Sequence, residues 1–194
     1  MNEEKQLIYN EIVSKYGFDR EQRFQIELGL QENLNVSLYA RPEFDWLNMK
    51  AIRLGLEQNI DVSIYAKPEF SFTQMQEIRR GLEKGVDVSW YAKPEFSTEK
   101  MSLVRIGLEK GLDVSWYANP KFNKSQMFHI RQGLEDGFDV NIYASPEFDE
   151  FQMFQIYEGL IRGFDVSVYA NPSIKWNEMR KILWAIGDEL KAKK

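Results

Sequence analysis

The stretch PEFSFTQMQEIRRGLEKGVDVSWYAK at residues 68–93 decides the fold of this chain. Ser71 is a favourable N-cap, and Gln74 three residues later completes the capping-box pattern that opens a helix. Apolar residues then follow at spacings of three and four, on one helix face: Met75, Ile78 and Leu82. Gly85 is typical of the position just past a helix end, so the stretch predicts a helix of about fourteen residues.

The end of the same stretch predicts a second, much shorter helix. Asp87 is placed to cap it, because an aspartate side chain accepts a free backbone N–H at a helix start. A helical run of so few residues is typical of 3₁₀ geometry. Pro94 restricts the residue before it to extended backbone and so ends the turn.

The stretch is one copy of a repeat that continues along the chain without insertion. Tyr-Ala recurs every 26 residues, at Tyr39, Tyr65, Tyr91, Tyr117, Tyr143 and Tyr169. A unit of this size cannot bury its apolar face alone and must stack on its neighbours. The sequence therefore predicts an all-α protein, an α-solenoid of seven 26-residue repeats, each with one long and one short helix. We expect a single domain over 1–194, with an N-terminal capping helix at 1–15, six repeats at 16–171 and a C-terminal capping repeat at 172–194.

The composition excludes several classes of function. The chain has 194 residues, with 30 Asp and Glu, 25 Lys and Arg, one His and no Cys. Without cysteine there is no disulfide framework, thiolate zinc site or iron–sulfur cluster. The net charge of -5 argues against a nucleic-acid partner, since binding to a phosphate backbone normally needs a basic surface. The N-terminus holds no long apolar stretch, so we expect a cytoplasmic protein without membrane association, cofactor or metal.

Positions that stay constant between copies should be those that stacking requires. With Pro68 as slot 1, the core is predicted from the phenylalanines of slot 3, the isoleucines of slot 11, the leucines of slot 15 and the valines of slot 21. The glycine of slot 14, such as Gly81, costs about 1 kcal/mol relative to alanine inside a helix. We infer that the Tyr-Ala of the short helix approaches it closely. The tyrosine of slot 24, such as Tyr91, is expected in the core with its hydroxyl on a neighbouring turn.

Slots 5, 9 and 13 share one helix face but change from copy to copy. They collect aromatic residues beside charged ones, a mixture typical of protein-interaction hot spots. The alternative is that these rings shield the apolar groove between layers. Slot 23, always apolar, holds two tryptophans and is a second contact candidate. The predicted partner-binding residues are Trp46, Phe72, Trp90, Trp116, Phe128, Phe154 and Trp184.

A repeated arginine at slot 12 precedes a glutamate by four residues, as in Arg53 and Glu57. Such pairs within one helix are worth a few tenths of a kcal/mol when exposed. The arginines could also pair with the aspartate at slot 20 of a neighbouring copy, so the structural interpretation is a ladder of salt bridges between repeats. The alternative is a stripe that binds a small anion. The candidate anion-binding residues are Arg53, Arg79, Arg105 and Arg131.

No catalytic constellation is visible in the sequence. The single histidine, His129, lies at a variable slot, is expected to face solvent and has no serine–acid pattern repeated around it. The recurrent carboxylates fall at turns and caps, where capping explains them. Neither a Walker A nor a dinucleotide-binding glycine pattern occurs. The chain is therefore predicted not to be an enzyme.

The segment MQEIRRGLEKGVDVSWYAKPEF at residues 75–96 resembles a repeat common in uncharacterised proteins of gut Firmicutes, their mobile elements and phages. The pairing of one α-helix with one short helix is similar to the leucine-rich variant repeat. The resemblance covers nearly the whole chain. It implies a helical repeat fold without catalytic residues, and a mobile-element origin, with action in the host cytoplasm if a phage encodes it. Small phage-encoded proteins of this type include inhibitors of host defence systems.

Two functional hypotheses follow. The first is a non-enzymatic scaffold that binds another protein through a face of the stacked helices. It would act sterically, by occupying a surface of that protein. The second is a binder of a small anionic ligand or nucleotide through the repeated arginines.

Overall fold

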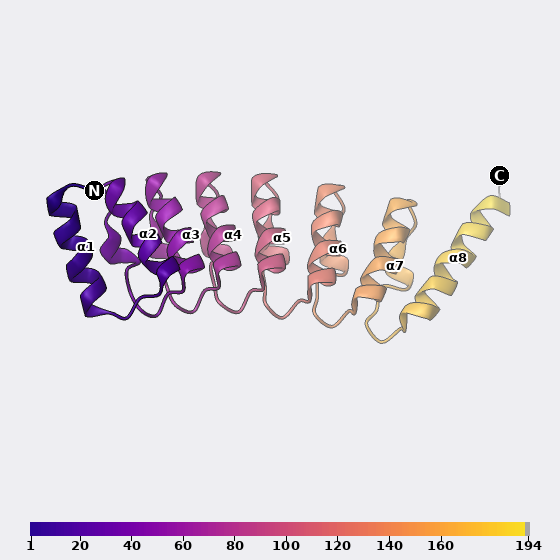
Figure 1. Cartoon of the computed structure of the whole chain (residues 1–194). Helices are drawn as coiled ribbons and strands as arrows, with labels where there is room; N and C mark the ends of the chain where they lie inside the picture. The colour runs from indigo at the N-terminus through magenta and orange to yellow at the C-terminus, as the bar shows by residue number, and fades with distance from the viewer. Residues whose placement is uncertain (193–194) are drawn as a thin grey trace. The chain divides into compact units, whose positions relative to one another are not determined.

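The computed structural model describes residues 1–192, and these contain helices and connecting turns but no strand (Figure 1). The long helices are α1 (Glu3–Lys15), α2 (Arg20–Gln31), α3 (Trp46–Glu57), α4 (Phe72–Glu83), α5 (Thr98–Glu109), α6 (Lys124–Glu135), α7 (Glu150–Ile161) and α8 (Trp176–Ala192). The short 3₁₀ helices are η1 (Val36–Leu38), η2 (Val62–Ile64), η3 (Val88–Trp90), η4 (Val114–Trp116), η5 (Val140–Ile142) and η6 (Val166–Val168). The predicted all-α class and the alternation of long and short helices are confirmed.

The residues group into two compact units, Met1–Met101 and Ser102–Lys194. In the first unit α1 packs on α2, α2 on α3 and α3 on α4 (Figure 1). In the second unit α6 packs on α7 and α7 on α8. Packing of each helix on the next is the α-solenoid arrangement that the repeat predicts. The expectation of one uninterrupted domain over 1–194 stays a prediction.

The long helices begin at the capping residues that the sequence predicts. The capping box expected at Ser71 forms, and the equivalent Asn123 and Asp149 form the same box, each with a glutamine three residues later. A fourth box, between Asp19 and Gln22, lies in the degenerate first copy, where the consensus did not reveal it. The aspartates of slot 20, predicted to cap the short helices, also do so: Asp61, Asp87, Asp113, Asp139 and Asp165.

The repeat helices α2 to α7 have 12 residues each, against about fourteen expected. They are shorter because a C-cap residue such as Lys84 precedes the slot-18 glycine. That glycine adopts a left-handed backbone, with φ of 69° at Gly85. The first two copies place asparagine there, Asn33 and Asn59, at φ of 58° and 55°. Asparagine is the next most tolerant residue in this conformation.

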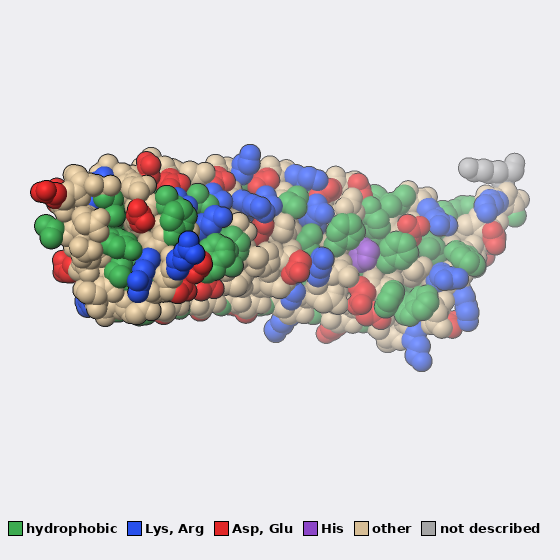
Figure 2. Space-filling model, in the orientation of Figure 1, with side chains coloured by type: hydrophobic (Ala, Val, Ile, Leu, Met, Phe, Trp, Pro, Cys, Tyr) green, Lys and Arg blue, Asp and Glu red, His purple; other side chains and the backbone are tan. Residues whose placement is uncertain are grey.

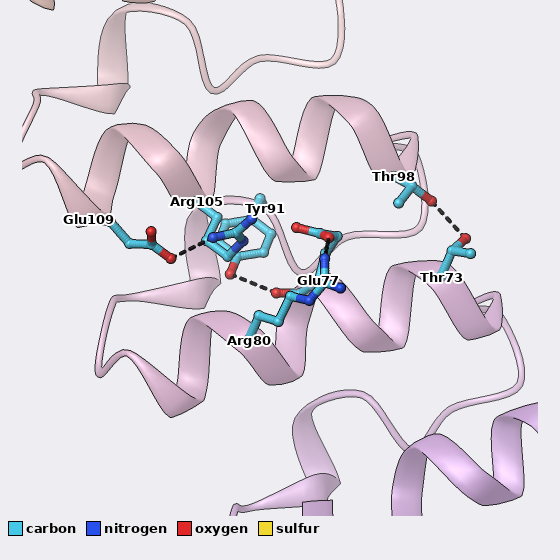
Figure 3. A network of polar contacts seen from close by, with 7 residues as sticks. All are labelled: Thr73, Glu77, Arg80, Tyr91, Thr98, Arg105 and Glu109. Carbon is cyan, nitrogen blue, oxygen red and sulfur yellow. Dashed lines mark hydrogen bonds and ion pairs between the residues drawn. The ribbon is translucent and has the colours of Figure 1, made fainter. Parts of the chain in front are cut away.

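Each slot-14 glycine accommodates the tyrosine that follows it. A Cβ on Gly81 would lie 1.9 Å from Oη of Tyr91 and 2.8 Å from Cγ1 of Val88. Tyr91 is fully buried, and its hydroxyl donates to the carbonyl oxygen of Glu77 at 3.2 Å (Figure 3). The predicted close approach is confirmed, but its second member is the slot-21 valine instead of the alanine. The hydroxyl reaches its own long helix instead of a neighbouring turn, because the missing side chain leaves the helix backbone open to the ring.

The glutamine of each capping box also links successive repeats. Nε2 of Gln74 donates to the carbonyl oxygen of Phe96 at 2.7 Å, while its Oε1 accepts from the backbone of Ser71. In the second unit, Nε2 of Gln126 donates to the carbonyl oxygen of Phe148 at 2.5 Å. One buried glutamine amide thus caps the start of a helix and hydrogen-bonds to the turn that begins the next repeat.

The core differs from the predicted one at two slots. The phenylalanines of slot 3, isoleucines of slot 11 and valines of slot 21 are buried as expected. The slot-15 leucines are only half-buried because they lie next to the helix end: Leu56, Leu82, Leu108, Leu134 and Leu160. Slot 10, expected to be variable surface, is instead buried in most copies: Gln25, Ala51, Glu77, Leu103 and Gln155.

Candidate partner-binding surfaces

Six of the seven predicted partner-binding aromatics are exposed by more than a third of their surface. The exposed fraction runs from 37% at Trp46 to 53% at Trp184. Phe72 is half-buried, as expected if its ring shields the space between layers. The remaining four exposed rings are Trp90, Trp116, Phe128 and Phe154.

Phe128, His129, Phe154 and Tyr157 form a connected group on α6 and α7, which we call the α6–α7 patch. The ring centroid of His129 lies 5.7 Å from Phe128 and 5.7 Å from Phe154. Tyr157 adds a third ring, at 6.4 Å from the histidine. The histidine ring therefore connects the two phenylalanines. Figure 2 shows hydrophobic side chains gathered over α6, α7 and α8.

His129 does not face solvent as predicted. Its side chain is half-buried, and its Nδ1 atom is buried without a hydrogen-bond partner in residues 1–192. Burial lowers the pKa of His129, while the charge of Glu150 acts in the opposite direction. The histidine is therefore a packing residue of the patch, because slot 10 turns toward the next helix and not outward.

Further aromatic contacts lie on α7 and α8. Phe151, exposed by 55%, packs on Trp176 with ring centroids 5.7 Å apart. The guanidinium of Arg180 lies over the ring of Trp184 at 4.7 Å. Comparing the repeat copies missed Phe151 because it occupies slot 6, outside slots 5, 9, 13 and 23. A search of every slot for exposed aromatics would have found it.

A groove of about 860 Å³ lies on the first unit, against α1, α2 and α3. We call it the α2–α3 groove. Its apolar wall includes Phe24 and Trp46, and its basic residues include Arg20 and Lys50. Phe24, exposed by 54%, was not among the predicted residues, because it lies in the first repeat copy, which the slot comparison left out.

The tryptophans of slot 23 lie on 3₁₀ helices. Trp90 ends η3 and Trp116 ends η4, and each exposes a little over a third of its surface. At the same slot Ile64 and Ile142 are half-buried. At slot 23 the isoleucines are therefore less exposed than the tryptophans, and Leu38 and Val168 are exposed as well.

The four repeated arginines form the i,i+4 pairs with the glutamates of their own helices, so these ion pairs lie within single helices and not between repeats as the predicted ladder required. Arg105 Nη1 lies 2.5 Å from Oε1 of Glu109 (Figure 3), and the other three copies make the same contact. The arginine side chains are only 10–14% exposed. Arg53 also donates to Gln25 of the preceding helix, where a slot-20 aspartate was one expected partner. An anion at these positions would compete with a glutamate already in place, so the anion stripe stays a prediction.

In residues 1–192, no three His, Asp or Glu side chains are grouped so that they could hold a metal ion. Over the same residues, no helix has the length and apolar character needed to cross a membrane.

Comparison with protein-family models, with curated proteins and with solved structures finds no match to this chain.

Proposed function

We propose that this chain is a non-enzymatic repeat protein that binds another protein through the aromatic face of its long helices. The observation that carries the proposal is the α6–α7 patch, where Phe128 and Phe154 stay more than 40% exposed. Exposed apolar clusters of this kind favour association, and aromatic anchors dominate the energetics of protein interfaces.

The packing around the patch supports a pre-organised binding surface. His129 contacts both phenylalanines, so neither ring is free to collapse onto the helix surface. Asn123 and Asp149 cap α6 and α7 and fix where each helix starts. A surface ordered before binding loses less conformational entropy when the partner arrives.

The proposed mechanism is steric occupation of the partner. A rigid row of side chains covers a surface that the partner needs for its own activity. The resemblance to repeats of phages and mobile elements of gut Firmicutes makes a bacterial host protein the proposed partner.

The test is affinity capture from a gut Firmicute lysate, followed by mass spectrometry of bound proteins and of extracted small molecules. The double variant Phe128→Ala with Phe154→Ala should reduce partner capture by about tenfold or more, with circular dichroism and melting near wild type. Ile161→Ala removes an exposed apolar side chain from α7, outside the patch and outside the predicted partner-binding residues, and is the matched control.

Full capture by the double variant would place the contact elsewhere, with Trp90 and Trp116 next to be tested. Recovery of a bound nucleotide or other anion in place of a protein would favour the arginine hypothesis. His129→Ala is unsuitable as a neutral control because its ring packs on both phenylalanines.

A further inference from the structure

The outward slots of the first unit carry an unusual balance of charge. Slots 5, 9 and 13 of α2, α3 and α4 hold three basic residues, three aromatic residues and no carboxylate. Residues 1–101 nevertheless contain more Asp and Glu than Lys and Arg. The nine residues are Arg20, Phe24, Leu28, Trp46, Lys50, Leu54, Phe72, Gln76 and Arg80.

The same slots of α6, α7 and α8 do not show this balance. There Lys124 and Arg180 are offset by Glu150 and Glu158. The basic and aromatic combination therefore belongs to the first unit and is not a general feature of the repeat.

Four of these residues line the α2–α3 groove, with basic and aromatic positions alternating between helices. Slots 5 and 9 hold Arg20 and Phe24 on α2, and Trp46 and Lys50 on α3. Figure 2 shows basic and acidic side chains beside hydrophobic ones over this end of the first unit. A ligand in the groove thus meets an aromatic ring and a cation on each helix.

The two cations are not engaged by the protein. Within residues 1–192, neither Arg20 nor Lys50 makes an ion pair or a side-chain hydrogen bond. The lining also holds Arg23, which donates to the carbonyl oxygen of Phe18, and three carboxylates, Asp19, Glu21 and Glu27. Asp19 caps α2, and Glu27 accepts a hydrogen bond from Gln31. Glu21 lies in the first turn of α2, where the helix dipole favours a negative charge.

We propose that the α2–α3 groove binds an acidic segment of another protein that carries an apolar anchor. Carboxylates of the segment pair with Arg20 and Lys50, while its apolar side chain enters between Phe24 and Trp46. The groove volume of about 860 Å³ is in the range that accepts a few side chains. This inference rests on the proposed protein-binding function and names the chemistry of one partner segment.

The experiment selects displayed random peptides of about 12 residues on the full-length protein. The enriched peptides are then synthesised, and their affinity is measured by fluorescence anisotropy. We expect sequences rich in Asp and Glu around a Trp, Phe or Leu. Their affinity should fall as NaCl is raised from about 50 to about 500 mM, because exposed charge pairs are screened by salt.

Two variants locate the binding. Arg20→Glu with Lys50→Glu should weaken peptide binding by at least about tenfold, and Phe24→Ala with Trp46→Ala should do the same. Lys67→Glu with Lys93→Glu makes the same change in net charge in the inter-repeat turns and should leave affinity unchanged. Circular dichroism of each variant checks that the fold is intact.

Several results would overturn the inference. They are peptides without acidic enrichment, peptides unaffected by both groove variants, or no selected peptide at all. Peptides that depend on Phe128 and Phe154 alone would refute the groove but leave the proposed function standing. If no peptide is selected and no protein partner is captured, the result would count against both the groove inference and the proposed function.

Discussion

At the scale of single residues, the contact between Gly107 and Tyr117 shows how the repeat uses a residue that is unfavourable in a helix. A Cβ on Gly107 would lie 1.8 Å from Oη of Tyr117, and that hydroxyl donates to the carbonyl oxygen of Leu103 at 3.2 Å. Glycine in a helix interior costs about 1 kcal/mol relative to alanine. The fully buried phenol and its hydrogen bond offset that cost, which explains why the glycine recurs.

Gly107→Ala should therefore lower the free energy of unfolding by about 2 kcal/mol or more, because the overpacking exceeds the gain in helix propensity. Chemical denaturation followed by circular dichroism measures it. The control is Gly187→Ala in α8, where the nearest atom to a new Cβ is Phe164 Cζ at 3.7 Å. There the helix propensity of alanine should raise stability or leave it unchanged.

A double variant separates the two causes. In Gly107→Ala with Tyr117→Phe, the closest remaining atoms are Cζ of the ring at 3.1 Å and Cγ1 of Val114 at 3.2 Å. The pair should be less destabilising than the sum of the single changes, since the phenol oxygen that overlaps the new methyl is gone. Strict additivity, or a more stable Gly107→Ala protein, would show that the glycine is kept for another reason.

At the scale of one element, the starts of α2, α4, α6 and α7 each have a capping-box glutamine that accepts one hydrogen bond and donates another. Gln74 accepts from the backbone of Ser71 through Oε1 and donates through Nε2 to the carbonyl oxygens of Pro94 and Phe96. Its side chain is buried. A local capping box and the stacking of the next turn therefore share one amide.

Gln74→Glu keeps the acceptor but replaces the donor with a second acceptor that faces two carbonyl oxygens. The free energy of unfolding should fall by about 1–3 kcal/mol at neutral pH, the cost of buried carbonyl groups left without a donor. Gln76→Glu makes the same charge change two residues later on α4, where the side chain is half-buried, and should have a smaller effect. Equal losses in the two variants would mean that added charge, and not the lost donor, is responsible.

The sequence predicts these elements well where the interaction is local. The caps, the left-handed glycine and the short helix follow from a few neighbouring residues, and internal repetition shows each of them several times. The crossing hydrogen bond of Gln74 was not predicted, because its partner, 22 residues away, is a backbone group that carries no sequence signal. His129 was misplaced for a similar reason, since its burial depends on Phe154 and Tyr157 of the next helix.

The candidate surfaces were predicted in part. Comparing slots identified Phe128 and Phe154 because those slots vary while the core does not. It missed Phe24 because the first copy is degenerate. The groove around Phe24 also depends on α1, which lies outside the repeat pattern. The charge of a binding partner can be inferred only from exposed side chains that are not paired within the protein. Which side chains remain unpaired depends on three-dimensional packing, so the sequence alone does not predict it.

At the scale of the whole molecule, repetition multiplies the effect of one buried group. Burial raises the pKa of the slot-24 tyrosines Tyr39, Tyr65, Tyr117 and Tyr143, and raises that of Tyr169 to about 12. A tyrosine in the unfolded chain ionises near pH 10. Between these two values the unfolded state holds fewer protons than the folded state, so the free energy of unfolding must fall as the pH rises.

Stability from this source should be fully present below about pH 9 and be lost progressively above about pH 10, by up to about 1.4 kcal/mol per pH unit for each buried tyrosine. Urea denaturation at fixed ionic strength, followed by circular dichroism from about pH 8 to about pH 11.5, measures the slope. Tyr169→Phe removes one ionisable phenol and should make the alkaline slope shallower, even though it leaves the carbonyl of Gln155 without its donor. Phe128→Tyr adds a phenol at an exposed position and should leave the slope unchanged, because solvent reaches that position in both states. A free energy of unfolding that stayed constant across the alkaline range would mean that the slot-24 tyrosines become exposed to solvent before the helices unfold.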